Sequence, residues 1–171
     1  SPLKKIKRTY LNDIYGIIKG VEMGWGKAVA PLHIIKNHAK VNVLEVKNTT
    51  TALQQLALFH RHQFDLPVIG ITGSNGKTIV KEWLFQLLHT DYQIVRSPKS
   101  YNSQIGVPLS VLRIQSPHNL GIFEAGISKI KEMGNIAPII NPSIGIFTNI
   151  GDAHNEGFSS IEEKVREKSQ L

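Results

Sequence analysis

The strongest constraint on this chain is a glycine-rich loop, "GSNGKT" (73–78), between the apolar segment "VIGIT" and the helical pattern "IVKEWL". Such a loop turns backbone N–H groups toward an anion at the positive end of the following helix. Lys77 has the length to reach terminal phosphates, and the Thr78 hydroxyl suits a magnesium ion that bridges them. The loop therefore predicts a nucleotide site, formed by Gly73, Ser74, Asn75, Gly76, Lys77 and Thr78.

The glycine spacing departs from that of the common phosphate loop. The pattern G-x-x-x-x-G-K-[ST] requires a glycine at the position that Ile71 occupies here, whereas the glycines stand at Gly70, Gly73 and Gly76. A structural alternative is a glycine-rich turn whose lysine caps a helix. Because strand, glycine loop, Gly-Lys-Thr and helix follow one another in order, the phosphate-binding interpretation is favoured over that turn.

Strands and helices alternate along the second part of the chain. Short apolar segments predict strands over 67–72, 92–97, 119–125 and 143–150. Periodic segments predict helices over 77–90, 105–114, 129–140 and 159–171. This alternation predicts an α/β fold with a parallel sheet and helices on both faces. Ligands of such sheets bind at the carboxyl ends of the strands, where the junctions after Thr72, around Glu124 and after Asn149 lie.

Local signals predict further detail. The alternating segment "VNVLEV" (41–46) indicates a strand. Residues 48–51 offer N-caps to a helix that ends before Pro67 and whose apolar face contains Leu53, Leu56, Ala57 and Phe64. The inward face of the 77–90 helix is expected to contain Val80, Leu84, Leu87 and Leu88. Two overlapping capping boxes open the last helix, Ser159…Glu162 and Ser160…Glu163.

Composition narrows the class of protein. The 171 residues are 41% apolar, enough for a core, and they include no cysteine, which excludes disulfides and thiolate metal sites. No apolar run is long enough to cross a membrane, and no signal-peptide pattern follows the basic N-terminus. The net charge is +7, and residues 1–66, with ten Lys/Arg and four Asp/Glu, hold +6 of it. A solvated surface explains this excess better than nucleic-acid binding, since no aromatic pattern accompanies it.

Three further residues are candidates for chemistry, each beside a plainer alternative. Glu124 ends an apolar strand, where a carboxylate faces the phosphate loop; it is otherwise a polar strand terminus. Lys168 follows Ile161 and Val165 at i+7 and i+3, which places it on their helix face. A buried lysine tends to lose its proton, and a neutral amine reacts with carbon dioxide to form a carbamate; alternatively, Lys168 extends to water. Asn102 is either a substrate contact or a helix N-cap.

The loop "GSNGKT" is similar to the G-[TS]-N-G-K-[TS] signature of the Mur ligase superfamily. These enzymes use ATP to join amino acids or peptides to a UDP-sugar during peptidoglycan synthesis. The resemblance implies that Glu124 binds a magnesium ion, and that His154, in "TNIGDAHNEGF", binds a second metal. It also implies that Lys168 is carbamylated and helps to bind the second magnesium. Asn149 matches a motif position whose role the residues do not reveal.

The stretch "YNSQIGVPLSVL" (101–112) resembles the family segment between the nucleotide and the UDP-sugar, which makes Asn102 a predicted substrate contact. Ala153 stands where most branches of the family have an aspartate. "AHNEGF" and "NPSIGIFTNIG" resemble the branch that adds D-Ala-D-Ala to UDP-N-acetylmuramoyl-tripeptide, a cytoplasmic bacterial activity. "SPKSYNSQIGVPLS" resembles a version fused to alanine racemase. Other amide ligases of folylpolyglutamate or cyanophycin type, and a nucleotide-binding fragment without activity, remain alternatives.

The resemblance also implies a division into domains. Residues 66–171 correspond to the central ATP-binding ligase domain, in incomplete form and without the C-terminal domain. Residues 1–65 correspond to a remnant of the N-terminal UDP-sugar-binding domain, a small truncated α+β piece, with a linker helix. The isolated chain is accordingly expected to be inactive as a ligase, with catalytic roles for Lys77, His154 and Lys168.

Overall fold

The computed structural model describes residues 46–151 and 157–171. The chain divides into two compact units, Ser1–Lys47 and Asn48–Leu171, and all helices and strands given below lie in the second. The strand expected over 41–46 lies outside the described residues except for Val46, which is in no strand. Within the described residues, no helix has the length and apolar character needed to span a membrane.

Four parallel strands form the sheet, which confirms the predicted α/β class. In space their order is β2 (Ile94–Arg96), β3 (Leu120–Glu124), β1 (Val68–Thr72) and β4 (Ile144–Phe147). Ile71 in β1 lies opposite Glu124 on one side and opposite Ile146 on the other. The register therefore brings the carboxyl ends of β1, β3 and β4 to one edge of the sheet.

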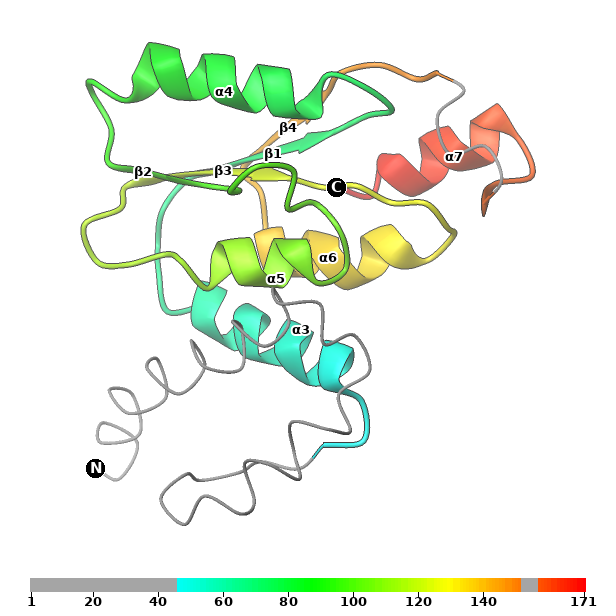
Figure 1. Ribbon diagram of the computed structural model, residues 1–171, viewed down its shortest axis with the longest axis horizontal. Coiled ribbons are helices and arrows are strands. Elements are labelled where there is room, and N and C mark those ends of the chain that lie inside the picture. The colour runs from blue at the N-terminus through cyan, green and yellow to red at the C-terminus, as the bar shows by residue number, and fades with distance from the viewer. Residues whose placement is uncertain (1–45, 152–156) are drawn as a thin grey trace. The chain divides into compact units, whose positions relative to one another are not determined.

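Helices lie on both faces of this sheet (Figure 1). α4 (Lys77–Leu88) covers one face and contacts β1, β2 and β3. The opposite face carries α5 (Gly106–Val111) and α6 (Glu132–Ile140). α3 (Thr49–Arg61) packs on α5 and α6, and α7 (Ile161–Lys168) packs on α6. α3 thus belongs to the same compact unit as the sheet.

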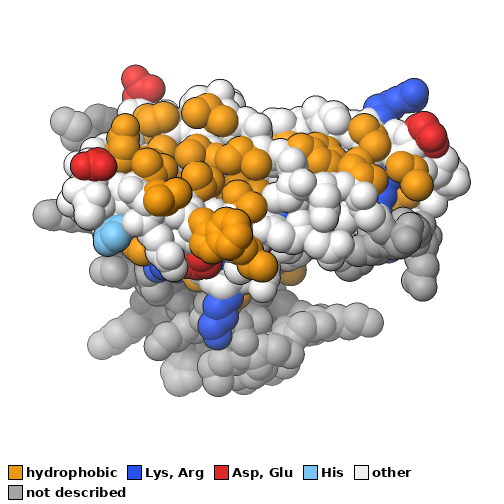
Figure 2. Space-filling model, turned by 90° about the horizontal axis from the view of Figure 1, so that it is seen from above, with side chains coloured by type: hydrophobic (Ala, Val, Ile, Leu, Met, Phe, Trp, Pro, Cys, Tyr) orange, Lys and Arg blue, Asp and Glu red, His pale blue; other side chains and the backbone are white. Residues whose placement is uncertain are grey.

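The core between α4 and the sheet explains which face of α4 is inward. Val80, Leu84 and Leu88 pack against four buried strand residues, Ile69, Ile71, Leu120 and Ile122. The expected inward position of Leu87 is wrong, because this side chain is 72% exposed. Leu87 continues the row of Ile79 and Trp83 at helical spacing, on the outer surface of α4. Figure 2 shows apolar side chains gathered over this surface.

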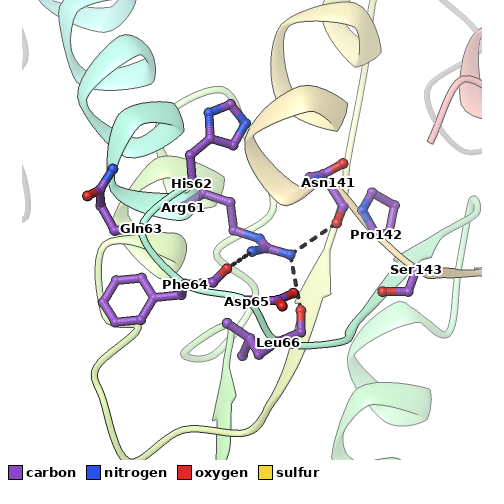
Figure 3. A pocket seen from close by; sticks show the side chains of 9 residues that line it. All are labelled: Arg61, His62, Gln63, Phe64, Asp65, Leu66, Asn141, Pro142 and Ser143. Atoms are coloured by element: carbon purple, nitrogen blue, oxygen red, sulfur yellow. Dashed lines mark hydrogen bonds between the residues drawn. The ribbon is translucent and has the colours of Figure 1, made fainter.

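The two ends of α3 follow local hydrogen bonding. Asn48 is the N-cap, and its Oδ1 accepts a hydrogen bond from the Thr51 N–H at 2.9 Å, as its position predicts. The helix ends at Arg61, so Phe64 is not on its apolar face as expected. The buried Arg61 guanidinium donates to the carbonyls of Phe64 at 2.8 Å and Asn141 at 3.2 Å (Figure 3). These bonds hold the turn after α3 against the turn before β4, at the amino ends of the strands.

At the start of α7, one half of the predicted Ser160…Glu163 capping box forms, the bond to the serine hydroxyl. Ser160 is the N-cap, and its Oγ accepts a hydrogen bond from the Glu163 N–H at 3.2 Å. The Glu163 carboxylate accepts hydrogen bonds from the backbone N–H and the hydroxyl of Ser159, both at 2.7 Å. Ser159 therefore pairs with Glu163 and not with Glu162, the partner that the other box predicted. Glu163 therefore forms hydrogen bonds with both serines, through its carboxylate to Ser159 and through its N–H to Ser160, and α7 begins at Ile161.

Candidate nucleotide-binding site

The loop after β1 requires glycine at two positions. Gly73 has φ 134° and Gly76 has φ 80°, both in the region that L side chains rarely adopt. A Cβ at Gly73 would also overlap the Thr148 hydroxyl oxygen. Gly76 precedes α4 and supplies no side-chain cap, so the first N–H groups of α4 have no side-chain acceptor there. The unusual glycine spacing thus matches two separate conformational requirements.

Asn149, just after β4, holds this loop from the neighbouring strand. Its Oδ1 accepts a hydrogen bond from the Asn75 N–H, and its carbonyl accepts one from the Ser74 N–H, both at 2.9 Å. The Thr148 hydroxyl donates to the Asn75 carbonyl at 2.6 Å. Since the amides of Ser74 and Asn75 are used in this way, the amides available to an anion are those at the start of α4.

Three of the predicted residues meet at the end of β3. Glu124 is fully buried, and its Oε2 accepts hydrogen bonds from the Thr78 hydroxyl at 3.0 Å and from the Asn102 amide at 3.4 Å. Thr78 comes from the first turn of α4 and Asn102 from the segment before α5. The structure therefore brings the predicted metal residues, Thr78 and Glu124, together with the predicted substrate residue.

The donor set at this corner fits a magnesium ion. A hydroxyl and a carboxylate are hard oxygen ligands, and magnesium in phosphate sites takes one or two of them beside water and phosphate oxygens. Within the described ranges, no group of three or more His, Cys, Asp or Glu side chains forms an all-protein metal cage. Thr78 and Glu124 would be the ligands from these ranges, and the ion would neutralise phosphate charge there.

Lys81 is a site residue that the sequence patterns did not single out. Its side chain is fully buried, and its Nζ lies 2.9 Å from Glu124 Oε1. It also donates to the carbonyls of Ser97, at 2.9 Å, and Lys99. Helical spacing could have identified Lys81 from the sequence, because it follows Thr78 by one turn and so lies on the same face of the helix.

Two further lysines surround the carbonyl of Gly73. Lys77 Nζ donates to it at 2.8 Å and Lys168 Nζ at 3.4 Å. Burial, together with the smaller effects of the charges of Lys77 and Lys164, lowers the pKa of Lys168 to about 8. Burial also lowers the pKa of Lys77, against the opposing effect of Glu124. The loop is therefore lined with buried positive charge, as a polyphosphate site requires.

The burial of Lys168 is confirmed, but the reason given for it is wrong. Ile161 and Val165, which defined its expected apolar face, are 54% and 37% exposed. The buried side chains of α7 are instead Lys164, Glu167 and Lys168. They are buried because they find polar partners, as when Glu167 Oε1 accepts a hydrogen bond from the Met133 N–H at 3.1 Å. His154, which was predicted to bind the second metal ion together with Lys168, lies outside the described residues.

With this geometry in place, comparison with known proteins decides the family. The profile of the Mur ligase middle domain matches residues 71–171, from the end of β1 to the last residue. The chain belongs to the Mur ligase family. The matched range includes the whole glycine-rich loop, residues 73–78.

Individual Mur ligases extend the comparison. The UDP-N-acetylmuramoyl-tripeptide–D-alanyl-D-alanine ligase of Borreliella burgdorferi is 38% identical over 128 residues, covering 75% of this chain. The chain spans only 28% of that relative's length. MurF from Acinetobacter baumannii is 33% identical with a TM-score of 0.71, over 74% of this chain and 28% of that one. MurF ligase from Thermotoga maritima, solved in complex with ADP, is 29% identical with a TM-score of 0.69, over 77% of this chain and 31% of that one.

Proposed function

We propose that this chain forms the nucleotide-binding part of an ATP-dependent amide ligase, which adds D-Ala-D-Ala to UDP-N-acetylmuramoyl-tripeptide. The observation that carries the proposal is the Thr78–Glu124 contact at the start of α4, beside a glycine loop of Mur ligase type. The relatives supply the substrates, since the Borreliella burgdorferi enzyme is named for this reaction. ATP and UDP-linked precursors are cytoplasmic compounds, so the proposed location is the bacterial cytoplasm.

The chain's own residues would bind and orient ATP. The first amides of α4 and Lys77 hold the β- and γ-phosphates, and Thr78 and Glu124 are the magnesium ligands. The tripeptide carboxylate attacks the γ-phosphorus and ADP leaves; the D-Ala-D-Ala amine then attacks the acyl carbon, and phosphate leaves as the amide forms. Positioning and charge neutralisation account for most of the catalysis in such a reaction. Asn102, which already contacts Glu124, would orient the incoming carboxylate.

Carbamylation of Lys168 is part of the proposal. With a pKa of about 8, about half of the Lys168 side chains are neutral amines at pH 8 and available to carbon dioxide. A carbamate would replace the repulsion from Lys77 and Lys164 by attraction, and it would join His154 as a ligand of a second metal. ¹³C NMR with labelled bicarbonate should show a carbamate signal in the wild-type chain and none in Lys168→Ala. Equal signals in both proteins would remove the carbamate.

The domain assignment stays a proposal as well. We infer that residues 66–171 are the central ATP-binding domain and that residues 1–65 contain a remnant of the UDP-sugar-binding domain with α3 as its linker. Expression of 48–171 tests the boundary, because α3 packs on α5 and α6. If fragment 48–171 unfolds cooperatively and fragment 66–171 does not fold, α3 is part of the ATP-binding domain. If fragment 66–171 folds by itself, α3 is the linker.

The decisive experiment for the function is phosphate release by the full-length protein. We expect release to require ATP, magnesium, UDP-tripeptide and D-Ala-D-Ala together, and the product to be the pentapeptide precursor. The matched controls replace UDP-tripeptide and D-Ala-D-Ala with substrates of the folate or cyanophycin type. Release with those controls, or release indifferent to either proposed substrate, would refute the assignment. ATP binding without any turnover would indicate a nucleotide-binding module.

A further inference from the structure

Lys81 is the buried charge that the proposed chemistry leaves unexplained. It stands on α4, one turn after Thr78, with a side-chain exposure of 0%. Its ammonium reaches Glu124 Oε1 at 2.9 Å and donates to the carbonyls of Ser97, at 2.9 Å, and Lys99. The ammonium therefore forms an ion pair with Glu124 on β3 and donates to two backbone carbonyls of the segment after β2. Glu82 Oε1 on α4 also lies 3.2 Å from the Lys81 Nζ.

The two oxygens of Glu124 consequently have different partners. Oε1 faces Lys81, whereas Oε2 accepts from the Thr78 hydroxyl at 3.0 Å and from the Asn102 amide at 3.4 Å. Thr78 lies at the N-terminus of α4, where phosphate would bind, so Oε2 is the oxygen on the nucleotide side. Without the Lys81 contact, Oε1 would be a buried charged oxygen with no partner, and only the two hydrogen bonds to Oε2 would orient the carboxylate.

Lys81 also connects Glu124 to the segment that carries Asn102. Ser97 Oγ accepts a hydrogen bond from the Glu124 N–H at 3.1 Å, while the Ser97 carbonyl binds Lys81. Lys99, whose carbonyl binds the same ammonium, has φ 49°, a backbone conformation that needs support from its surroundings. One ammonium thus fixes both the carboxylate and the turn that leads to Asn102.

We propose that Lys81 is a positioning residue of the ligase site: it fixes Glu124 so that Oε2 alone faces the nucleotide's metal ion, and it holds the turn before Asn102 in register with that carboxylate. The inference rests on the proposed function, because it assigns an orienting partner to the magnesium ligand. Lys81 acts through Glu124 and contacts no phosphate. Partners that orient a metal ligand typically change metal affinity by about 10- to 100-fold when removed.

Calorimetry of ADP binding tests the proposal without any need for turnover. The titration is run with magnesium and with a chelator, on the wild-type chain, Lys81→Met, Glu124→Gln and the double variant. The control is Arg96→Met, because Arg96 pairs with Glu82, which lies 3.2 Å from Lys81, so that this variant changes a neighbour of Lys81 and keeps the Lys81–Glu124 pair. We expect Lys81→Met to lose roughly 10- to 100-fold of ADP affinity in magnesium and little in chelator. Arg96→Met should behave as wild type.

The double variant shows whether Lys81 acts through Glu124. In the Glu124→Gln background, Lys81→Met should cause no further loss, since coupled residues are not additive. A wild-type response in Lys81→Met, or a loss of equal size in chelator, overturns the role of Lys81. A wild-type chain whose ADP binding does not depend on magnesium overturns the proposed nucleotide site itself, and the two failures are thereby distinguished.

A measurement on the unaltered chain covers the case in which Lys81→Met fails to fold. A fully buried ammonium that donates to two carbonyls and pairs with Glu124 should give a slowly exchanging ¹⁵N lysine signal, with a contact to the Glu124 side chain. We expect the signal and the contact to persist when magnesium and ADP are added. Loss of the contact on addition would mean that the metal displaces Lys81, which contradicts the proposal.

Discussion

Lys168 and Lys77 share one acceptor, because both ammonium groups approach the carbonyl of Gly73, at 3.4 and 2.8 Å. These two cations, one buried and one half-buried, repel each other, and Lys164 adds a third positive charge nearby. Such an arrangement is unfavourable in the empty site and favourable once phosphate binds. At the scale of single residues, the loop is therefore built for an anion, and its charges give the predictions that follow.

Replacing Lys168 with Met should change how stability depends on pH. The pKa of Lys168 is lowered from 10.5 to about 8, so the unfolded chain binds more protons between these values. By linkage, this residue makes the wild type gain stability as pH rises from about 8 to about 10.5, while below about pH 8 both states are protonated and its destabilising effect is constant. Thermal unfolding in bicarbonate-free buffer should show this rise in the wild type and a smaller one in Lys168→Met. Parallel curves for the two proteins would contradict the burial of a charged Lys168.

Replacing Asn149 with Ala should weaken nucleotide binding through the loop. The variant loses the acceptor of the Asn75 N–H, a hydrogen bond of 2.9 Å, and we expect a loss of about 1 kcal/mol in stability. ADP affinity should fall roughly 3- to 10-fold, because the loop loses one of the hydrogen bonds that hold its conformation. The control is Asn119→Ala, whose Oδ1 accepts from the Gln93 N–H at 2.8 Å, before β2 and β3 rather than at the loop. If both variants bind ADP equally well, Asn149 has no role in the site.

At the scale of elements, the strand and helix pattern was predictable and the side-chain partners were not. Alternation of apolar segments with helical ones predicted all four strands of the sheet. In β1 and β3 every residue is buried, which explains their continuous apolar sequence, whereas β4 is largely exposed. Lys81 was missed as a site residue, and Asn149 was noted only as a motif position without a role, because their partners, Glu124 and Asn75, are distant in sequence. Those contacts depend on the order β2-β3-β1-β4, which places β3 and β4 on either side of β1.

The two faces of α4 give a matched pair of variants. Leu84 packs against the buried residues of the sheet, whereas Leu87 is 72% exposed. Leu84→Ala should therefore lower the free energy of unfolding by about 2 kcal/mol, through lost burial and an unfilled space. Leu87→Ala should change it by less than about 0.5 kcal/mol. Denaturant unfolding checks both values. A larger loss for Leu87→Ala would show that the outer surface of α4 is covered in solution.

At the scale of the whole molecule, the two ends of the sheet differ in character. The carboxyl end gathers the glycine loop, Glu124 and the buried lysines, whereas the amino end is closed by Arg61 and the carbonyls that it binds. A parallel sheet binds ligands at its carboxyl end, so the chemistry and the topology select the same location. The family match places this chain among the Mur ligases, and the site explains which of its residues would bind the nucleotide.

The most direct test of that site is to map ADP and magnesium on the chain by NMR. We predict that amide signals of Gly76, Lys77 and Thr78 shift strongly, that Glu124 and Asn149 shift with them, and that Arg61 and Ser143 at the opposite end of the sheet do not. The Thr78→Ala variant should weaken the shifts when magnesium is present. Shifts centred on Arg61, or none at the start of α4 at saturating ADP, would contradict a nucleotide site in this loop.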